Sequence, residues 1–293
     1  MPNKRIHFGL QQATIGGSVV RGAQSVGFDI SPDFLDVVNY GQEDLLRIFE
    51  DKSSGSFTVQ RFLYPGFSAL WGSSIDALPI GVGGLTESNV GIVYSGGDGF
   101  TASYSLIDSI EYNFSSDGFF TESVTFSSEN ISSSSGFSAT SESGEVCRRA
   151  NFTSVTLPTE VSSAAVSDGA TGYLITSASI SASIGYGEIT SYGNKPQGSV
   201  TNKFKHLELP IEVESSVTVV IQNSVIPAMD RFENWISGGV PNKALSFVTC
   251  GKTFSVGSKN FLSGISLSGG DASGGNVEAT FTYRNKHGDF TIT

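Results

Sequence analysis

The stretch Leu106–Phe126, LIDSIEYNFSSDGFFTESVTF, decides the fold class of this chain. Apolar and polar residues alternate on both sides of Ser115–Gly118, which contains an Asp-Gly pair. Alternation with a period of two is typical of half-buried strands, and Asp-Gly is a strong turn signal. We therefore predict a β-hairpin. Its apolar face would carry Ile110, Tyr112, Phe114, Phe120, Val124 and Phe126, with Glu122 interrupting the series.

A second copy of this pattern follows at Phe261–Phe281, FLSGISLSGGDASGGNVEATF, about 155 positions downstream. At this offset Ile110 falls on Ile265 and Phe126 falls on Phe281. Identities are few, so the alternation and the position of the turn carry the match.

Two further blocks recur in the same order. Ser25–Gly41 matches Ser177–Gly193 at an offset of 152, and Ser56–Phe62 matches Ser216–Gln222 at an offset of about 160. Simple β alternation is common, so a chance match is the alternative for any single block. Three blocks in one order favour an internal duplication, with the changes in offset absorbed by loops.

The composition favours a mainly β chain with short strands. The 293 residues include 35 Gly and 21 Phe, and only 15% of the residues are charged. This length is sufficient for two domains. We predict two duplicated domains of the β-sandwich or barrel type, each with a short helix. The first would span residues 1–135 and the second residues 173–293, with residues 136–172 as a linker or tether.

Local patterns predict several further features. Leucine, isoleucine and phenylalanine at helical spacing in Gln42–Glu50 predict a short amphipathic helix. Pro227–Ile236 has the same character. Pro32 is expected to interrupt the strand that begins at Ser25, and residues 64–91 are expected to form a long loop.

The charge and the cysteines limit the function further. The net charge is −11 and the sequence pI is about 4.7, and no basic run of the kind that binds phosphates occurs. Cys147 and Cys250 are too few for a disulfide framework or a metal cluster, and we expect free thiols. The N-terminal segment lacks the apolar region of a secretory signal, and no apolar stretch is long enough to span a membrane.

Chemical motifs point to no enzyme. His7, His206 and His287 lie far apart in the sequence, and no G-x-S-x-G or P-loop pattern is present. A glycosidase requires two facing carboxylates, whereas Glu212 and Glu214 fall on one face of a predicted strand and suit a solvated surface. We expect no catalytic residue, cofactor or metal.

The duplicated hairpin resembles a known family. Ser109–Tyr112 (SIEY), the turn at Asp117-Gly118 and Phe120–Phe126 (FTESVTF) look like the closing strands of bacteriophage tail tube proteins. Phe28–Gly41, followed by the predicted helix, also fits the first half of that family. The second copy departs from the motif, with Val277-Glu278-Ala279 in place of Glu-Ser-Val.

This resemblance implies a small β-sandwich or barrel with one helix, whose inner strands join those of neighbouring subunits in a ring around a lumen. Two-domain members form rings of three chains with six-fold pseudo-symmetry. The expected partners are therefore further copies of the chain, as a trimer or a hexamer stacked into a tube, and other tail proteins. DNA would pass through the lumen without specific binding, helped by the acidic balance. The chain would act in the virion, after assembly in the host bacterial cytoplasm.

Nine side chains are candidates for contacts between subunits. Phe119 and Phe120 have two possible roles, as a plug of the domain core or as an exposed apolar tip. The full set is Ile110, Tyr112, Phe119, Phe120, Val124, Phe126, Ile265, Leu267 and Phe281.

Three other functions stay open at the level of sequence. A tail-tip or baseplate hub protein would use the same duplicated domain but would stop at one ring. A β-sandwich that binds carbohydrate or a host surface would need aromatic side chains lining a groove. A β-rich hydrolase would need a constellation of acids that the spacing does not reveal.

Overall fold

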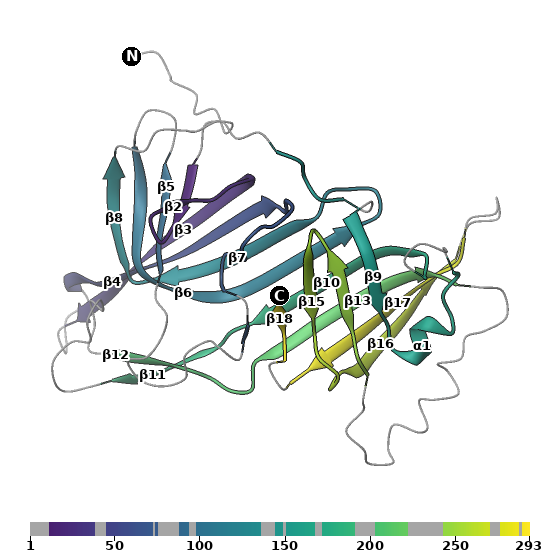
Figure 1. Cartoon of the computed structure of the whole chain (residues 1–293). Helices are drawn as coiled ribbons and strands as arrows, with labels where there is room; N and C mark the ends of the chain where they lie inside the picture. The colour runs from purple at the N-terminus through teal and green to yellow at the C-terminus, as the bar shows by residue number, and fades with distance from the viewer. Residues whose placement is uncertain are drawn as a thin grey trace.

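The computed structural model confirms the mainly β prediction, with 67% of the described residues in strands. The strands form antiparallel sheets in a sandwich-like arrangement (Figure 1). The described residues are 12–38, 45–72, 74–75, 88–93, 98–135, 144–148, 151–167, 172–190, 203–221, 243–269, 276–286 and 289–293.

One path of eight antiparallel strands runs through both halves of the chain (Figure 1). Its order is β3-β4-β7-β6-β10-β13-β17-β16, so the halves meet where β6 pairs with β10. The bounds are β3 Ala23–Val38, β4 Leu45–Phe62, β7 Thr121–Ser128, β6 Asp98–Ser115, β10 Ile175–Ser183, β13 Glu212–Val220, β17 Glu278–Asn285 and β16 Phe261–Ser268.

Shorter strands make a second layer in each half. In the first half the order is β2-β1-β5-β6-β8, where the N-terminal part of the long strand β6 takes part. In the second half the order is β9-β14-β15-β18. The bounds are β1 Gln12–Ile15, β2 Ser18–Val19, β5 Ser88–Val93, β8 Asn130–Ser135, β9 Phe152–Thr156, β14 Ser246–Thr249, β15 Lys252–Ser255 and β18 Thr291–Ile292.

Two small elements complete the described chain. The hairpin of β11 (Tyr186–Thr190) and β12 (Lys203–Leu207) leads from β10 to β13 and projects below the sheet in Figure 1. The single-turn helix α1 (Thr159–Ser162) follows Pro158. Within the predicted linker, β9 pairs with β14 and so belongs to the second-half layer.

The two halves correspond in strand order and in detail. β3-β4-β7-β6 has the same sequence of connections as β10-β13-β17-β16. Register irregularities also fall at positions related by the offsets 152 and 155 seen in the sequence. They lie between Ala23 and Ser25 and between Ile175 and Ser177, and again between Ile107 and Ser109 and between Leu262 and Gly264.

Both predicted hairpins are present. In the first, β6 and β7 place Ile110 opposite Val124 and Tyr112 opposite Glu122. In the second, β16 and β17 place Ile265 opposite Phe281. Ile110 and its partner are 14 positions apart in the chain, whereas Ile265 and its partner are 16 positions apart. The second hairpin therefore has two more residues between its paired positions than the first.

Aromatic rings from both halves pack together in one core. Phe254 on β15 lies 5.1 Å, between ring centroids, from both Tyr112 and Phe114 on β6. Phe290 contacts Trp71 at 5.4 Å and Tyr112 at 5.9 Å. All five side chains are buried, so the halves share apolar contacts as well as the β6–β10 ladder.

Four local predictions are wrong or fall at least partly outside the described residues. The helix at Gln42–Glu50 is wrong, because residues 45–50 are the start of β4 and pair with β3. Nine residues form an unstable helix alone, whereas pairing with β3 satisfies the backbone. β3 also continues through Pro32, which an edge strand tolerates. Within residues 64–91, the last four belong to β5, and residues 76–87 lie outside the described part. So does Pro227–Ile236.

The expectation of free thiols is also wrong. Cys147 and Cys250 form a disulfide, with their Cα atoms 5.9 Å apart. Both cysteines are buried, and the backbone of Cys147 forms hydrogen bonds with the backbones of Leu63 and Phe120. A separation of 103 residues hid this pairing, because only the tertiary fold brings the two cysteines together.

Candidate assembly interface

The two ends of the eight-strand path are open in the described structure. Among the described residues, β3 pairs with β4 as its one strand neighbour, and β16 pairs likewise with β17. The outer edge of such a strand presents backbone N–H and C=O groups that can pair with another chain. These two edges are therefore the candidate surfaces for contacts between subunits.

Exposed apolar side chains lie on both edges. Phe28 on β3 is 37% exposed, and Phe261 and Leu267 on β16 are 41% and 43% exposed. The ring of Phe28 also packs against Phe100, with 4.9 Å between centroids. Covering this apolar surface with a further strand would remove it from water, which favours association.

The β6–β10 junction shows how this fold closes such edges. Ile180 on β10 lies opposite Tyr112 on β6, and both side chains are fully buried. Ala182 lies opposite Ile110 on the same face, where both are also buried. The junction thus joins the first strand of one half to the last strand of the other and covers its apolar face.

The structure separates the nine candidate side chains by exposure. The buried ones are Ile110, Tyr112, Phe120, Val124, Phe126 and Phe281, Ile265 is half-buried, and the exposed ones are Leu267 and Phe119, the latter 50% exposed. Phe120 fills the core, whereas Phe119 lies outside it and packs on Phe62 with 5.1 Å between ring centroids. Leu267 and Ile265, which lie on β16, are the candidates that belong to an open edge.

Glu122, which interrupts the apolar series in the sequence, faces the core. It lies opposite Arg61 on β4, and Arg61 Nε donates to Glu122 Oε2 at 2.6 Å. Glu122 Oε1 accepts from the hydroxyl of Tyr112 and from the amide of Leu70, the latter at 3.0 Å. Trp71 Nε1 donates to the Tyr112 hydroxyl at 2.7 Å.

This buried network fixes the segment after β4 against the sheet. Burial raises the pKa of Glu122, and the neighbouring Arg61 opposes that rise. Burial also raises the pKa of Tyr112 well above its usual range, and the charge of Glu122 adds to the effect. Because Arg61 and Glu122 are both buried, the network is closed to substrate and has a structural role.

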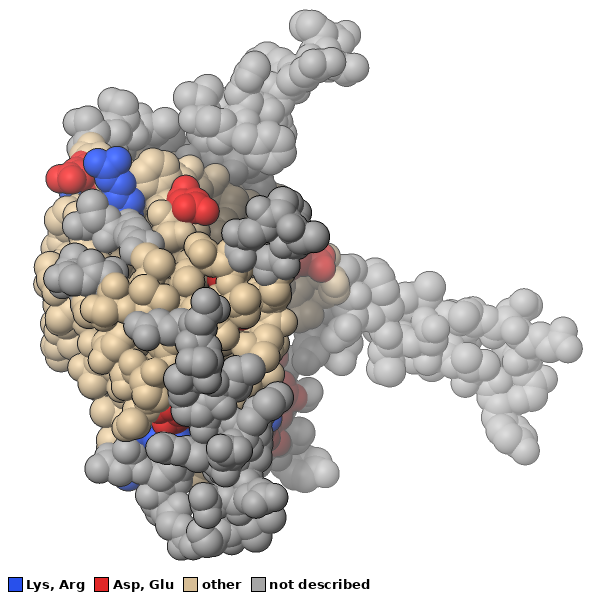
Figure 2. Space-filling model, turned by 90° about the vertical axis from the view of Figure 1, so that its right-hand side faces the viewer, with Lys and Arg blue, Asp and Glu red and all other residues tan. Residues whose placement is uncertain are grey.

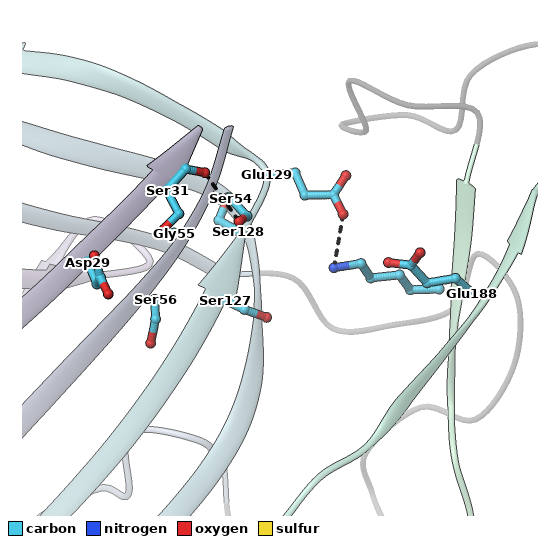
Figure 3. A pocket seen from close by; sticks show the side chains of 10 residues that line it. Asp29, Ser31, Ser54, Gly55, Ser56, Ser127, Ser128, Glu129 and Glu188 are labelled. Atoms are coloured by element: carbon cyan, nitrogen blue, oxygen red, sulfur yellow. Dashed lines mark hydrogen bonds and ion pairs between the residues drawn. The ribbon is translucent and has the colours of Figure 1, made fainter. Parts of the chain in front are cut away.

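A polar groove of about 320 Å³ lies between the β3–β4–β7 surface and the β11–β12 hairpin (Figure 3). Lys205 on β12 approaches Glu129 at 3.3 Å across it. The lining side chains are short and mainly hydroxyl or acidic, whereas small-molecule sites are mostly apolar. The lining residues are Asp29, Ser31, Ser54, Gly55, Ser56, Ser127, Ser128, Glu129, Glu188 and Lys205.

The structure describes three of the residues considered for chemistry, namely His206, Glu212 and Glu214. His206 lies on β12, and His7 and His287 lie outside the described residues. Glu212 and Glu214 share the polar face of β13 and pair with Arg284, at 3.2 and 3.3 Å. Within the described ranges, no group of three or more His, Cys, Asp or Glu side chains is arranged to hold a metal ion.

Figure 2 shows the end of the molecule that lies at the right in Figure 1. Its described surface carries few charged side chains, and these lie mainly toward the upper and lower borders (Figure 2). This part of the surface offers no cluster of Lys and Arg of the kind that binds phosphates. In the part of the chain described here, no helix has the length and apolar character needed to cross a membrane.

No protein-family model matches the chain, and no curated protein sequence matches it. A function for the chain is therefore inferred from its strand arrangement, its open strand edges and its net charge.

Proposed function

We propose that the chain is a structural subunit of a bacteriophage tail tube, which assembles with further copies into stacked rings around a lumen. The observation that carries this proposal is the pair of edges, β3 and β16, that have no outer neighbour among the described strands and lie at the ends of a sheet whose two halves already join edge to edge. A unit that joins its own halves in this way can join to another copy by the same contact. Repetition of that contact gives a ring if it closes.

An internal duplication supports the proposal. The halves share their strand order, and two register irregularities of the first half, at Ala23/Ser25 and Ile107/Ser109, have counterparts in the second half. Val59, the partner of Val26, corresponds to Val217, the partner of Ala178, at an offset of 158, close to the 160 seen in the sequence. Three chains with two such halves would supply six similar units to a ring.

The resemblance of the first hairpin to the tail tube family and the charge of the chain point the same way. A net charge of −11 at neutral pH repels a polyanion such as DNA. A lumen lined by part of that charge lets DNA pass without adhesion. The same chemistry disfavours a role in specific nucleic-acid binding.

Negative-stain microscopy of the purified chain over a range of concentrations tests the proposal, with tail particles as seeds. We expect rings and hollow tubes whose length grows with concentration. Rings that never stack, even on seeds, would favour the tail-tip hub protein instead. A chain that stays monomeric at every concentration and on every seed would contradict both.

A further inference from the structure

We propose that β16 of one chain pairs with β3 of a second copy, antiparallel and in the register that the β6–β10 junction defines. Leu267 then lies opposite Phe28 of the second copy, and Ile265 lies opposite Ile30. The choice of a second copy as the occupant rests on the proposed function, whereas the register rests on the strand pairing within the chain.

The register follows from the correspondence between the halves. β3 occupies the place of β10 in the strand order, and β16 occupies the place of β6. In the junction, Ile180 lies opposite Tyr112. The offset of 152 carries Ile180 to Phe28, and the offset of 155 carries Tyr112 to Leu267. The register irregularities that the two halves share, at Ala23/Ser25 and Ile175/Ser177 and at Ile107/Ser109 and Leu262/Gly264, fix both offsets, because a slip of one residue would displace them.

The apolar side chains at the new junction match those of the existing one. Within the chain, an aliphatic residue, Ile180, faces an aromatic one, Tyr112. Between chains, the aromatic residue comes from β3 as Phe28 and the aliphatic one from β16 as Leu267. The aromatic and aliphatic residues have thus changed strands, but each junction still pairs one aromatic side chain with one aliphatic side chain. Both edge residues are more than a third exposed in the isolated chain, so pairing would cover them.

The opposite face of the new junction is polar and compatible with water. Ser181 lies opposite Glu111 in the existing junction, and the same offsets place Asp29 opposite Ser266. Asp29 is the one charged residue in the segments that would pair, residues 23–31 and 261–268. No like charges therefore meet, and apolar contacts and backbone hydrogen bonds would hold the strands together.

Pro32 sets the end of the new ladder. In the existing junction, the amide of Ile184 donates to the carbonyl of Asp108 at 2.8 Å. The residue of β3 that corresponds to Ile184 is Pro32, which has no N–H to donate. The ladder between chains is therefore expected to end at Ser31.

Cysteine cross-linking tests the register. Ile184 and Asp108 form a hydrogen-bonded pair, so alternation places Ser181 and Glu111 in a non-hydrogen-bonded pair. The equivalent residues Asp29 and Ser266 would have closely spaced Cβ atoms, which suits a disulfide. We expect the D29C/S266C chain to form covalent oligomers on mild oxidation, and an equimolar mixture of D29C and S266C chains to form covalent dimers.

The matched control moves one cysteine by two residues on the same face. D29C/S268C should give at least about tenfold less cross-linked product, because diagonal neighbours are about 7–8 Å apart. Each single-cysteine variant, oxidised alone, shows how much product arises from exchange of the new thiol with the native Cys147–Cys250 disulfide. Equal cross-linking of the two double variants, or more from D29C/S268C, would overturn the register.

A charge at the edge gives an independent reading. L267E should abolish oligomers in sedimentation velocity, whereas L209E, at a residue 59% exposed in a turn outside both edges, should leave them unchanged. Oligomers of L267E equal to those of the unmodified chain would overturn the proposed contact.

Tubes without a D29C–S266C cross-link would refute the register but not the tube function. Cross-linked rings that never stack would support the register and count against the tube.

Discussion

Arg61 on β4 and Glu122 on β7 lie directly opposite each other and form a buried ion pair. Their side chains are 3% and 0% exposed, so water contributes little to their solvation. Tyr112 and Leu70 donate hydrogen bonds to the carboxylate, and Trp71 donates to the Tyr112 hydroxyl. The pair therefore holds the segment after β4 in place.

Glu122→Gln should destabilise the fold by about 3–5 kcal/mol, because it leaves the Arg61 guanidinium buried without a counter-charge. Chemical denaturation would measure the loss as a lower midpoint. Glu111→Gln, on the exposed face of β6, should change the free energy of unfolding by less than about 0.5 kcal/mol. Equal midpoints for Glu122→Gln and the unmodified chain would contradict the structural role of the pair.

Reduction of the Cys147–Cys250 disulfide should lower the free energy of unfolding by about 2–5 kcal/mol, because the cross-link closes a long loop in the unfolded chain. Denaturation with and without reductant measures this difference. A chain with both cysteines replaced by alanine should show no response to reductant. Alkylation of both thiols in the oxidised, denatured chain would show that the disulfide is absent.

Tyr112, Tyr186 and Tyr283 have pKa values raised above their ordinary value of 10.0, mainly because they are buried. Raised values mean that the folded chain keeps these phenols protonated while the unfolded chain ionises them. The corresponding stability is fully present below about pH 10 and is lost as the pH rises above that value. An ultraviolet titration should show these phenols ionising together with unfolding. Their ionisation near pH 10 in a chain that remains folded would contradict the burial.

Phe119 and Phe120 should differ sharply when truncated. Phe120→Ala should cost about 3–5 kcal/mol, because Phe120 is fully buried against Phe114 and Phe152. Phe119→Ala should cost far less, because half of its surface is exposed. Thermal or chemical unfolding of the two variants provides the comparison. Similar losses would mean that Phe119 also belongs to the core.

Much of the strand framework follows from alternation, but local pattern fails where pairing is non-local. The hairpin around Ser115–Gly118 and its second copy were predictable, because strong alternation and a turn signal lie close in the chain. Residues 45–50 have helical spacing yet pair with β3, because the long β3–β4 ladder supplies their backbone hydrogen bonds. Glu122 looked like an interruption, since its partner Arg61 lies 61 positions away.

By itself, the sequence determined the mainly β class, the two hairpins and the order of the recurring blocks, since these depend on alternation between near neighbours. Only the tertiary structure decided which faces are buried, that Cys147 bonds to Cys250, and that β6 joins β10 and leaves β3 and β16 at the ends. Such relations connect residues far apart in the chain. Their free energy comes from packing and backbone pairing that exist once the strands have assembled, so no local pattern records them.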